Sequence, residues 1–152
     1  MRGPSVRWLL LSDLHFNHRD LDRVRQTARW IVAQAERLQV RRVVMCGDLL
    51  TSRTMQPTDV LSACYRFVSS LSDAVPRVHV MPLDALNINR LAPYVSLHSG
   101  VAHHEWDGRR VLLLLPFREE QDELADAIAA LGPQEASKTV AFAYLAINKA
   151  IT

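Results

Sequence analysis

The sequence predicts an α/β domain, because two apolar runs of strand length are separated by a segment with helical periodicity. Residues 6–12 and 42–46 are largely apolar, as is typical of strands that are covered on both faces. Between them, residues 20–38 form an amphipathic helix with Asp20 as the N-cap. Strand, helix and strand in this order form a right-handed crossover with two parallel strands. We therefore expect a layered fold in which a central mixed β-sheet is flanked by helices. The apolar helix positions, spaced by three and four, are Leu21, Val24, Ala28, Ile31, Ala35 and Leu38.

Composition places the 152 residues in one domain, residues 1–152, with a real hydrophobic core. Hydrophobic residues make up 49% and charged residues 22%, and the net charge of +2 is too small to indicate nucleic-acid binding by itself. No apolar run approaches the roughly 18 residues that cross a bilayer, so we expect no membrane partner. Cys46 and Cys64 fall in a strand and a helix, which predicts reduced core thiols and an intracellular, cytoplasmic location.

The central part of the chain continues the alternation of helix and strand. A second helix is expected to begin at Pro57, since proline is well tolerated at the first helical position. A third strand spans 77–81, with His79 as a core or edge histidine. The buried stripe of the second helix is Val60, Cys64, Phe67, Val68 and Leu71.

The last third of the sequence is richer in strands. Residues 94–98, 101–106 and 111–117 are strand candidates, and Asp107-Gly108 is a good hairpin turn. The acidic segment 118–123 suits the N-terminus of a helix that ends at Gly132-Pro133, and a final strand spans 139–145. The expected buried face of that helix is Leu124, Ala125, Ile128 and Leu131.

Potential metal ligands follow the first two strands directly. Asp13 and His15 come after the first strand, and Asp48 comes after the second, where Gly47 allows a tight turn. Loops at the carboxyl ends of neighbouring parallel strands meet in one crevice. In a locally extended chain Asp13 and His15 leave the same face, and oxygen and nitrogen ligands together suit Mn²⁺, Fe²⁺ or Zn²⁺. The alternative is a structural α/β domain in which the two aspartates only cap turns.

A second group of possible ligands is His103, His104 and Glu105. Neighbouring residues of a strand point to opposite faces, so two adjacent imidazoles rarely bind one ion. We expect these residues on the surface of a hairpin.

The Asp-x-His and Gly-Asp motifs at successive strand ends resemble the calcineurin-like metallophosphoesterase superfamily. The order of the later elements is most similar to its DNA-repair nuclease branch. The resemblance implies that Asp13 and His15 bind a first metal and that Asp48 bridges to a second. It implies a phosphodiester or phosphomonoester substrate, which in the nuclease branch is DNA. Candidate phosphate contacts, with plain solubility as the alternative, are Arg19, Arg23, Arg53 and Arg118.

The sequence departs from the family pattern after the third strand. A Gly-Asn-His-Asp segment is expected there, but Met81 is followed by Pro82, and Asp84, Asn87 and Asn89 stand at other spacings. Tyr144 stands where the family has a metal-binding histidine, and the sequence ends before a Gly-His-x-His motif, which suggests a domain that is incomplete at its C-terminus.

These departures leave two functions open. One is a metal-dependent phosphoesterase, with a nuclease as one form of it, that has at most one well-held ion, for which Mn²⁺ is the first expectation and Fe²⁺ and Zn²⁺ are alternatives. The other is a catalytically inactive relative that acts as a binding or regulatory module. The motif pattern assigns no catalytic residue beyond the metal ligands Asp13, His15 and Asp48.

Overall fold

The computed structural model describes residues 7–52, 55–81, 96–97, 102–105, 111–115 and 121–143, which contain the helices and strands expected from the sequence. Most of these elements are one or a few residues shorter than expected. In chain order they are β1 (Trp8–Ser12), α1 (Leu21–Arg37), β2 (Arg42–Cys46), α2 (Thr58–Ala74), β3 (Val78–Met81), β4 (Ser96–Leu97), β5 (Ala102–Glu105), β6 (Val111–Leu115), α3 (Gln121–Ala130) and β7 (Thr139–Ala143).

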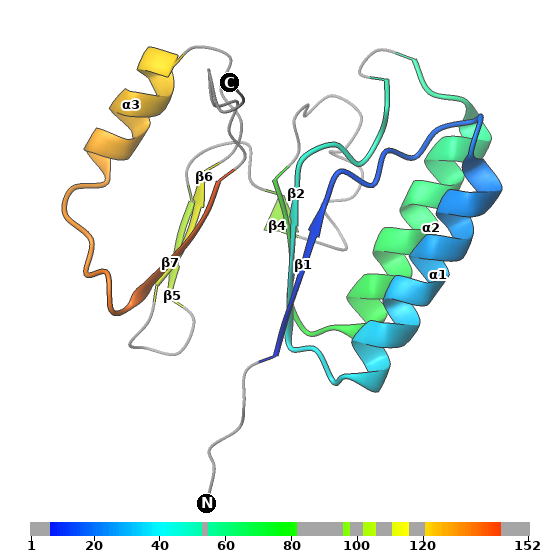
Figure 1. The fold of residues 1–152 in the computed structure, drawn as a ribbon, viewed down its shortest axis with the longest axis horizontal. Helices are drawn as coiled ribbons and strands as arrows, with labels where there is room; N and C mark the ends of the chain where they lie inside the picture. The colour runs from blue at the N-terminus through cyan, green and yellow to red at the C-terminus, as the bar shows by residue number, and fades with distance from the viewer. Residues whose placement is uncertain are drawn as a thin grey trace, which may run out of the picture.

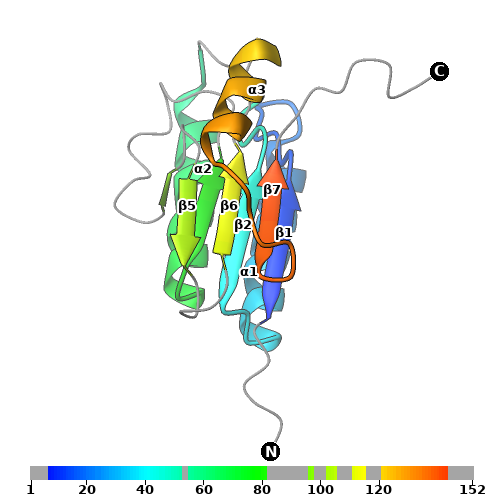
Figure 2. The same ribbon diagram turned by 90° about the vertical axis from the view of Figure 1, so that its left-hand side faces the viewer.

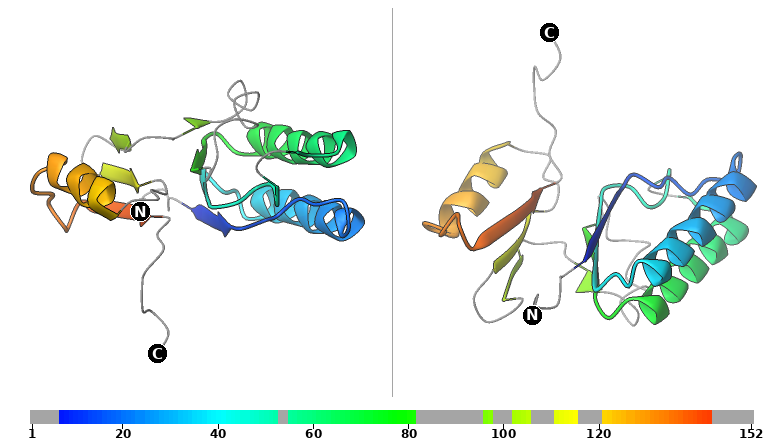
Figure 3. Two further views of the ribbon diagram at one scale, coloured as in Figure 1. Left: turned by 90° about the horizontal axis from the view of Figure 1, so that it is seen from above. Right: turned by 60° about the horizontal axis from the view of Figure 1, so that its bottom comes forward.

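The described strands form two sheets, which corrects the expectation of one central sheet. A parallel sheet has the order β1-β2-β3-β4, and a smaller sheet has the order β5-β6-β7. In the smaller sheet β5 and β6 are antiparallel and β6 and β7 are parallel. Figure 2 shows the smaller sheet facing the larger one, and Figure 3 shows the helices outside them. The fold is therefore mixed α/β, with two stacked sheets between layers of helix.

Helices α1 and α2 cover one face of the larger sheet (Figure 1). Their apolar stripes pack on alternate strand residues, among them Val43 and Met45 of β2 and Val78 and Val80 of β3, because side chains in a strand alternate between faces. The expected helical stripes are confirmed apart from Val24, which is half-buried, and Leu38, which is 40% exposed at the C-terminal end of α1. The residues of α1 and α2 in this core are Leu21, Ala28, Ile31, Ala35, Val60, Ala63, Cys64, Phe67, Val68 and Leu71.

The other face of the larger sheet packs against the smaller sheet. Val44 and Met81 contact Leu112 and Leu114 of β6 in a separate buried cluster. This packing explains why β6 is apolar on both faces. One face of β6 packs against β2 and β3, and the other faces the outer side of the smaller sheet. At the edge of the cluster, the rings of Trp8 and Phe142 stack with centroids 5.8 Å apart.

Two polar side chains are buried in the larger sheet. Arg42 and His79 are only 5% and 4% exposed, which confirms the expectation that His79 is not a surface residue. Arg42 Nη1 lies 3.5 Å from His79 Nε2, and the guanidinium lies 5.1 Å from the ring centroid of Trp8. Burial, and secondarily the charge of Arg77, lowers the pKa of Arg42 from its ordinary value. Arg42 and Trp8 pair at the start of β1 and β2, so Arg42 lies at the end of the sheet opposite Asp13 and Asp48.

One local expectation, the N-cap of α1, is confirmed in position, and another, the buried face of α3, needs correction. Asp20 occupies the N-cap of α1 but makes no capping hydrogen bond with its side chain; instead Asn17 Oδ1 accepts a hydrogen bond from the Asp20 amide at 2.8 Å. In α3, Ala125 is exposed and Ile128 is 46% exposed, so they do not form the buried face that their spacing predicted. Four of the ten residues of α3 are alanines, which offer little apolar area to bury.

Cys46 and Cys64 are both free thiols. Of the helices in the described ranges, none has the length and apolarity that a membrane span requires.

Candidate metal centre

The residues after β1 and β2 run side by side because the two strands are parallel and in register. Ser12 pairs with Cys46 at the last position of the ladder. Backbone hydrogen bonds continue beyond it: the amide of Asp13 donates to the carbonyl of Cys46 at 3.3 Å, and the amide of His15 donates to the carbonyl of Asp48 at 3.0 Å. The backbone thus brings Asp13, His15 and Asp48 to one edge of the sheet, as the sequence predicted.

Phe16 fixes the far end of these two loops. Its ring is fully buried and lies 5.8 Å from the ring of Phe67 in α2, measured between centroids. Its amide donates to the carbonyl of Leu49 at 2.7 Å, and its carbonyl accepts from the amide of Thr51 at 3.2 Å. Phe16 also forms an isolated parallel bridge with Leu50. The segment that carries Asp13 and His15 is therefore held at both ends.

The backbone of this segment is left-handed at the two candidate ligands. Asp13 has a φ of 51° and His15 a φ of 47°. The expectation that these side chains leave one face of an extended chain is therefore wrong, since neither residue is extended. A positive φ is uncommon for residues other than glycine and clusters at functional sites. Gly47 has a φ of 88°, which confirms the tight turn expected before Asp48.

Both oxygens of the Asp13 carboxylate are hydrogen-bonded. Oδ1 accepts from the amide of Asp48 at 3.2 Å, and Oδ2 accepts from the hydroxyl of Ser12. These hydrogen bonds orient the carboxylate at the edge of the sheet. Asp13 and His15 are exposed and Asp48 is half-buried, so an ion or a substrate can reach this edge from solvent.

The side chains are less closely gathered than the backbone. Across the described residues, no three side chains of histidine, cysteine, aspartate or glutamate stand together as a ready group of metal ligands. Hydrogen bonds of the Asp13 carboxylate and the His15 amide with the main chain of Asp48 join the three candidates. The described structure thus joins the three candidates through the backbone and does not gather their side chains around one point.

Polar residues that the sequence reading did not single out support the site. Ser12 orients Asp13. The hydroxyl of Thr51 and the side-chain Nδ2 of Asn17 donate to the carbonyl of His15 at 3.2 and 2.9 Å. The available signal was the presence of serine, threonine and asparagine next to a turn, where such side chains bind backbone groups. Burial, and secondarily the charge of Asp13, raises the pKa of the Cys46 thiol to about 11, so this thiol is protonated at neutral pH.

The candidate phosphate contacts are only partly described. Arg19 and Arg23 are exposed near the start of α1, beside a hydrogen bond of 3.1 Å between His18 Nδ1 and Asp59 Oδ2. His103, His104 and Glu105 lie in β5, paired antiparallel with β6 as the hairpin expectation requires. Several other residues discussed above lie outside the described ranges: Arg53, Asp84, Asn87, Asn89, Arg118 and Tyr144.

No family model matches the chain, and no curated protein matches it either.

Proposed function

We propose that this chain is a metal-dependent phosphoesterase domain in which Asp13, His15 and Asp48 hold one divalent ion. The observation that carries the proposal is the positive φ of both Asp13 and His15, directly after a strand and beside the turn that carries Asp48. Such backbone conformations cost on the order of 1–3 kcal/mol each and persist where the surroundings hold them in place. Here the hydrogen bonds to Cys46 and Asp48 hold them at an exposed edge of the sheet.

The donor set fits a divalent ion of the Mn²⁺, Fe²⁺ or Zn²⁺ type. Asp13 and Asp48 supply hard carboxylate oxygens, and His15 supplies an imidazole nitrogen. When bound, such an ion polarises a phosphoryl oxygen and activates water. The chain's own part is to hold Asp13 in one orientation through Ser12 and the Asp48 amide. We propose a phosphodiester or phosphomonoester as the substrate, with DNA as one candidate.

A second candidate function is a catalytically inactive domain that binds a metal or a partner. The sequence favours it at two places, Pro82 after β3 and Tyr144 after β7, where the resemblance calls for further ligands. Three protein ligands can hold one ion. One ion stabilises the charge that develops on a transferred phosphoryl group less than two ions would.

Hydrolysis of bis-p-nitrophenyl phosphate and p-nitrophenyl phosphate with added Mn²⁺ tests the proposal. We expect turnover that Asp13→Asn or Asp48→Asn abolishes, because each removes a charged ligand and keeps the side-chain shape. Asp73→Asn is the matched control, since Asp73 is exposed on α2 and lies outside the site. Turnover that survives both site substitutions overturns the proposal.

Calorimetry with Mn²⁺ separates the two candidates. Binding that requires Asp13 and Asp48 without any turnover supports the inactive domain. Turnover together with the same binding supports the phosphoesterase.

A further inference from the structure

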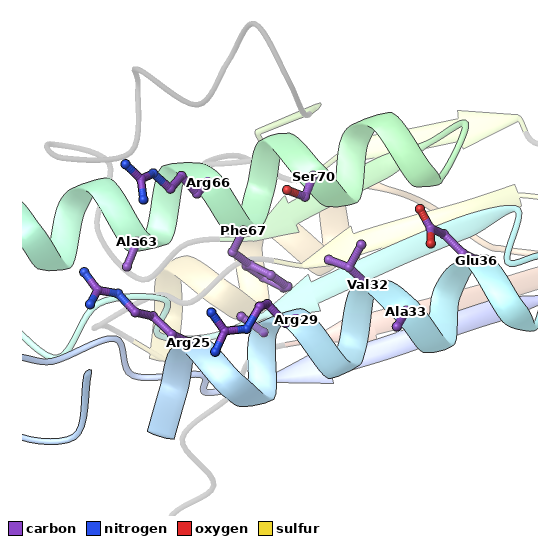
Figure 4. A pocket seen from close by; sticks show the side chains of 10 residues that line it. Arg25, Arg29, Val32, Ala33, Glu36, Ala63, Arg66, Phe67 and Ser70 are labelled. Atoms are coloured by element: carbon purple, nitrogen blue, oxygen red, sulfur yellow. The ribbon is translucent and has the colours of Figure 1, made fainter. Parts of the chain in front are cut away.

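Helices α1 and α2 form a groove that has an apolar floor. A cavity of about 410 Å³ lies between them, lined by residues of both helices. Figure 4 shows Phe67 and Val32 extending into the space between the two helices. Phe67 and Ala28 are buried, whereas Val32 is only partly covered. The floor is formed by Ala28, Val32, Ala63 and Phe67.

Three arginines gather at one end of this groove. Arg25 and Arg29 come from α1 and Arg66 from α2, whereas Glu36 lies toward the other end (Figure 4). Arg25 has a long ion pair of 3.5 Å with Asp22. Among the described residues, none forms a hydrogen bond or ion pair with Arg29 or Arg66. The groove therefore presents positive charge that the described fold leaves largely uncompensated.

We propose that this groove binds an acidic amphipathic helix of a partner protein. The carboxylates of such a helix would meet Arg29 and Arg66, and its apolar face would cover Val32, which is only partly buried. From Arg25 to Glu36 the axis of α1 rises about 16 Å, roughly three helical turns. An amphipathic helix docked in an apolar groove is a recurring mode of peptide recognition.

The distribution of charge also sets the direction of the bound helix. Its acidic turns lie at the end with the arginines, and a basic residue suits the end with Glu36. A nucleic-acid backbone could use the arginines but has no apolar face for Val32. The groove is lined entirely by α1 and α2 and does not include Asp13, His15 or Asp48, so this inference is independent of the proposed phosphoesterase function.

Fluorescence anisotropy with a labelled peptide tests the proposal on the full chain. The probe is a helix-forming peptide of roughly three turns, with glutamates in its first turns, a leucine stripe at spacings of three and four, and lysine in its last turn. We expect saturable binding that weakens as salt rises, because the charges are exposed. Combining Arg29→Glu with Arg66→Glu should weaken binding at least about tenfold, since two charge-assisted contacts become repulsive.

Arg41→Glu is the control, because Arg41 is exposed, lies outside the groove and undergoes the same charge change as each of the two groove arginines. It should leave the affinity nearly unchanged, and circular dichroism should show the same helix content in all variants. An equal loss in Arg41→Glu, no effect of the double substitution, or no saturable binding overturns the proposal.

Two further measurements exclude other occupants. Sedimentation velocity of the chain alone should show no dimer that depends on Arg29 and Arg66; such a dimer would make a second copy the occupant. A single-stranded oligonucleotide that binds through these arginines more tightly than the peptide would also overturn the proposal.

Discussion

At the scale of single residues, the unusual feature is the left-handed backbone at Asp13 and His15. An L-residue with a side chain pays a steric penalty in this region, and glycine does not. Hydrogen bonds from the amides of Asp13 and His15 to the neighbouring loop keep the conformation in place. The strain is therefore local and can be measured by changing only the side chain.

His15→Gly should leave the protein more stable than His15→Ala by about 1 kcal/mol, because both remove the imidazole but only glycine removes the clash at positive φ. Urea unfolding followed by circular dichroism measures the difference. Equal stability of the two variants, or a more stable alanine variant, would show that this backbone is not strained.

Ionisation of the buried Cys64 thiol should lower the free energy of unfolding at alkaline pH. Burial raises the pKa of its thiol from an ordinary value of 9.0 to about 12. The folded state therefore keeps the proton longer than the unfolded chain does, so the stabilisation is complete below pH 9 and is lost as pH rises toward about 12. Cys64→Ala should be less stable at neutral pH, because of the lost packing, but should lose less stability between about pH 9 and 11. An equal alkaline slope in urea unfolding would contradict this.

The placement of Asp13, Gly47 and Asp48 could be predicted from sequence, because parallel strands deliver their carboxyl ends to one edge. The positive φ of Asp13 could not, since it depends on hydrogen bonds with a loop more than thirty residues away. The hydrogen bond from the Ser12 hydroxyl to the Asp13 carboxylate could not be predicted either, because a serine at a strand end has several possible partners.

At the scale of elements, α1 and α2 were predictable because their periodicity is strong and their partners are the strands next to them in sequence. The assignment of β6 to a second sheet was not. The apolar run at 111–115 suits a strand in the middle of one sheet or a strand stacked on another, and only the contacts of Leu112 and Leu114 decide between them. In α3, a helical spacing of apolar residues did not guarantee a buried face for Ala125 and Ile128.

Leu112→Ala should lower the free energy of unfolding by about 2–5 kcal/mol, since Leu112 is fully buried between the sheets and leaves a cavity. Leu10→Ala is the control with the same chemical change, because Leu10 is 57% exposed, and it should cost under about 1 kcal/mol. Chemical denaturation of both variants compares them, and similar losses would argue against a packed interface between the sheets.

At the scale of the whole molecule, two separate buried layers hold the sheets and helices together. The larger lies between α1, α2 and the four-stranded sheet, and the smaller lies between the two sheets. The candidate metal centre lies at one end of the four-stranded sheet. The buried ring of Phe16, next to it, belongs to the larger layer. An ion bound there should therefore stabilise the fold as a whole.

Added Mn²⁺ should raise the melting temperature, and the rise should grow with Mn²⁺ concentration, because a ligand of the folded state stabilises it by mass action. Excess EDTA should reverse the shift. Asp13→Asn or Asp48→Asn should abolish it, while Asp73→Asn should keep it. Differential scanning fluorimetry makes the comparison. A shift of equal size in the two site variants would place the ion elsewhere.

The hydrogen bonds that continue from Ser12 and Cys46 to Phe16 and Thr51 also limit how this protein can evolve. An insertion or deletion of one residue in either loop would shift every later partner and pull the ring of Phe16 out of the core. We therefore expect a change of length in one loop to require a matching change in the other, and we expect point substitutions to be tolerated more readily at this edge.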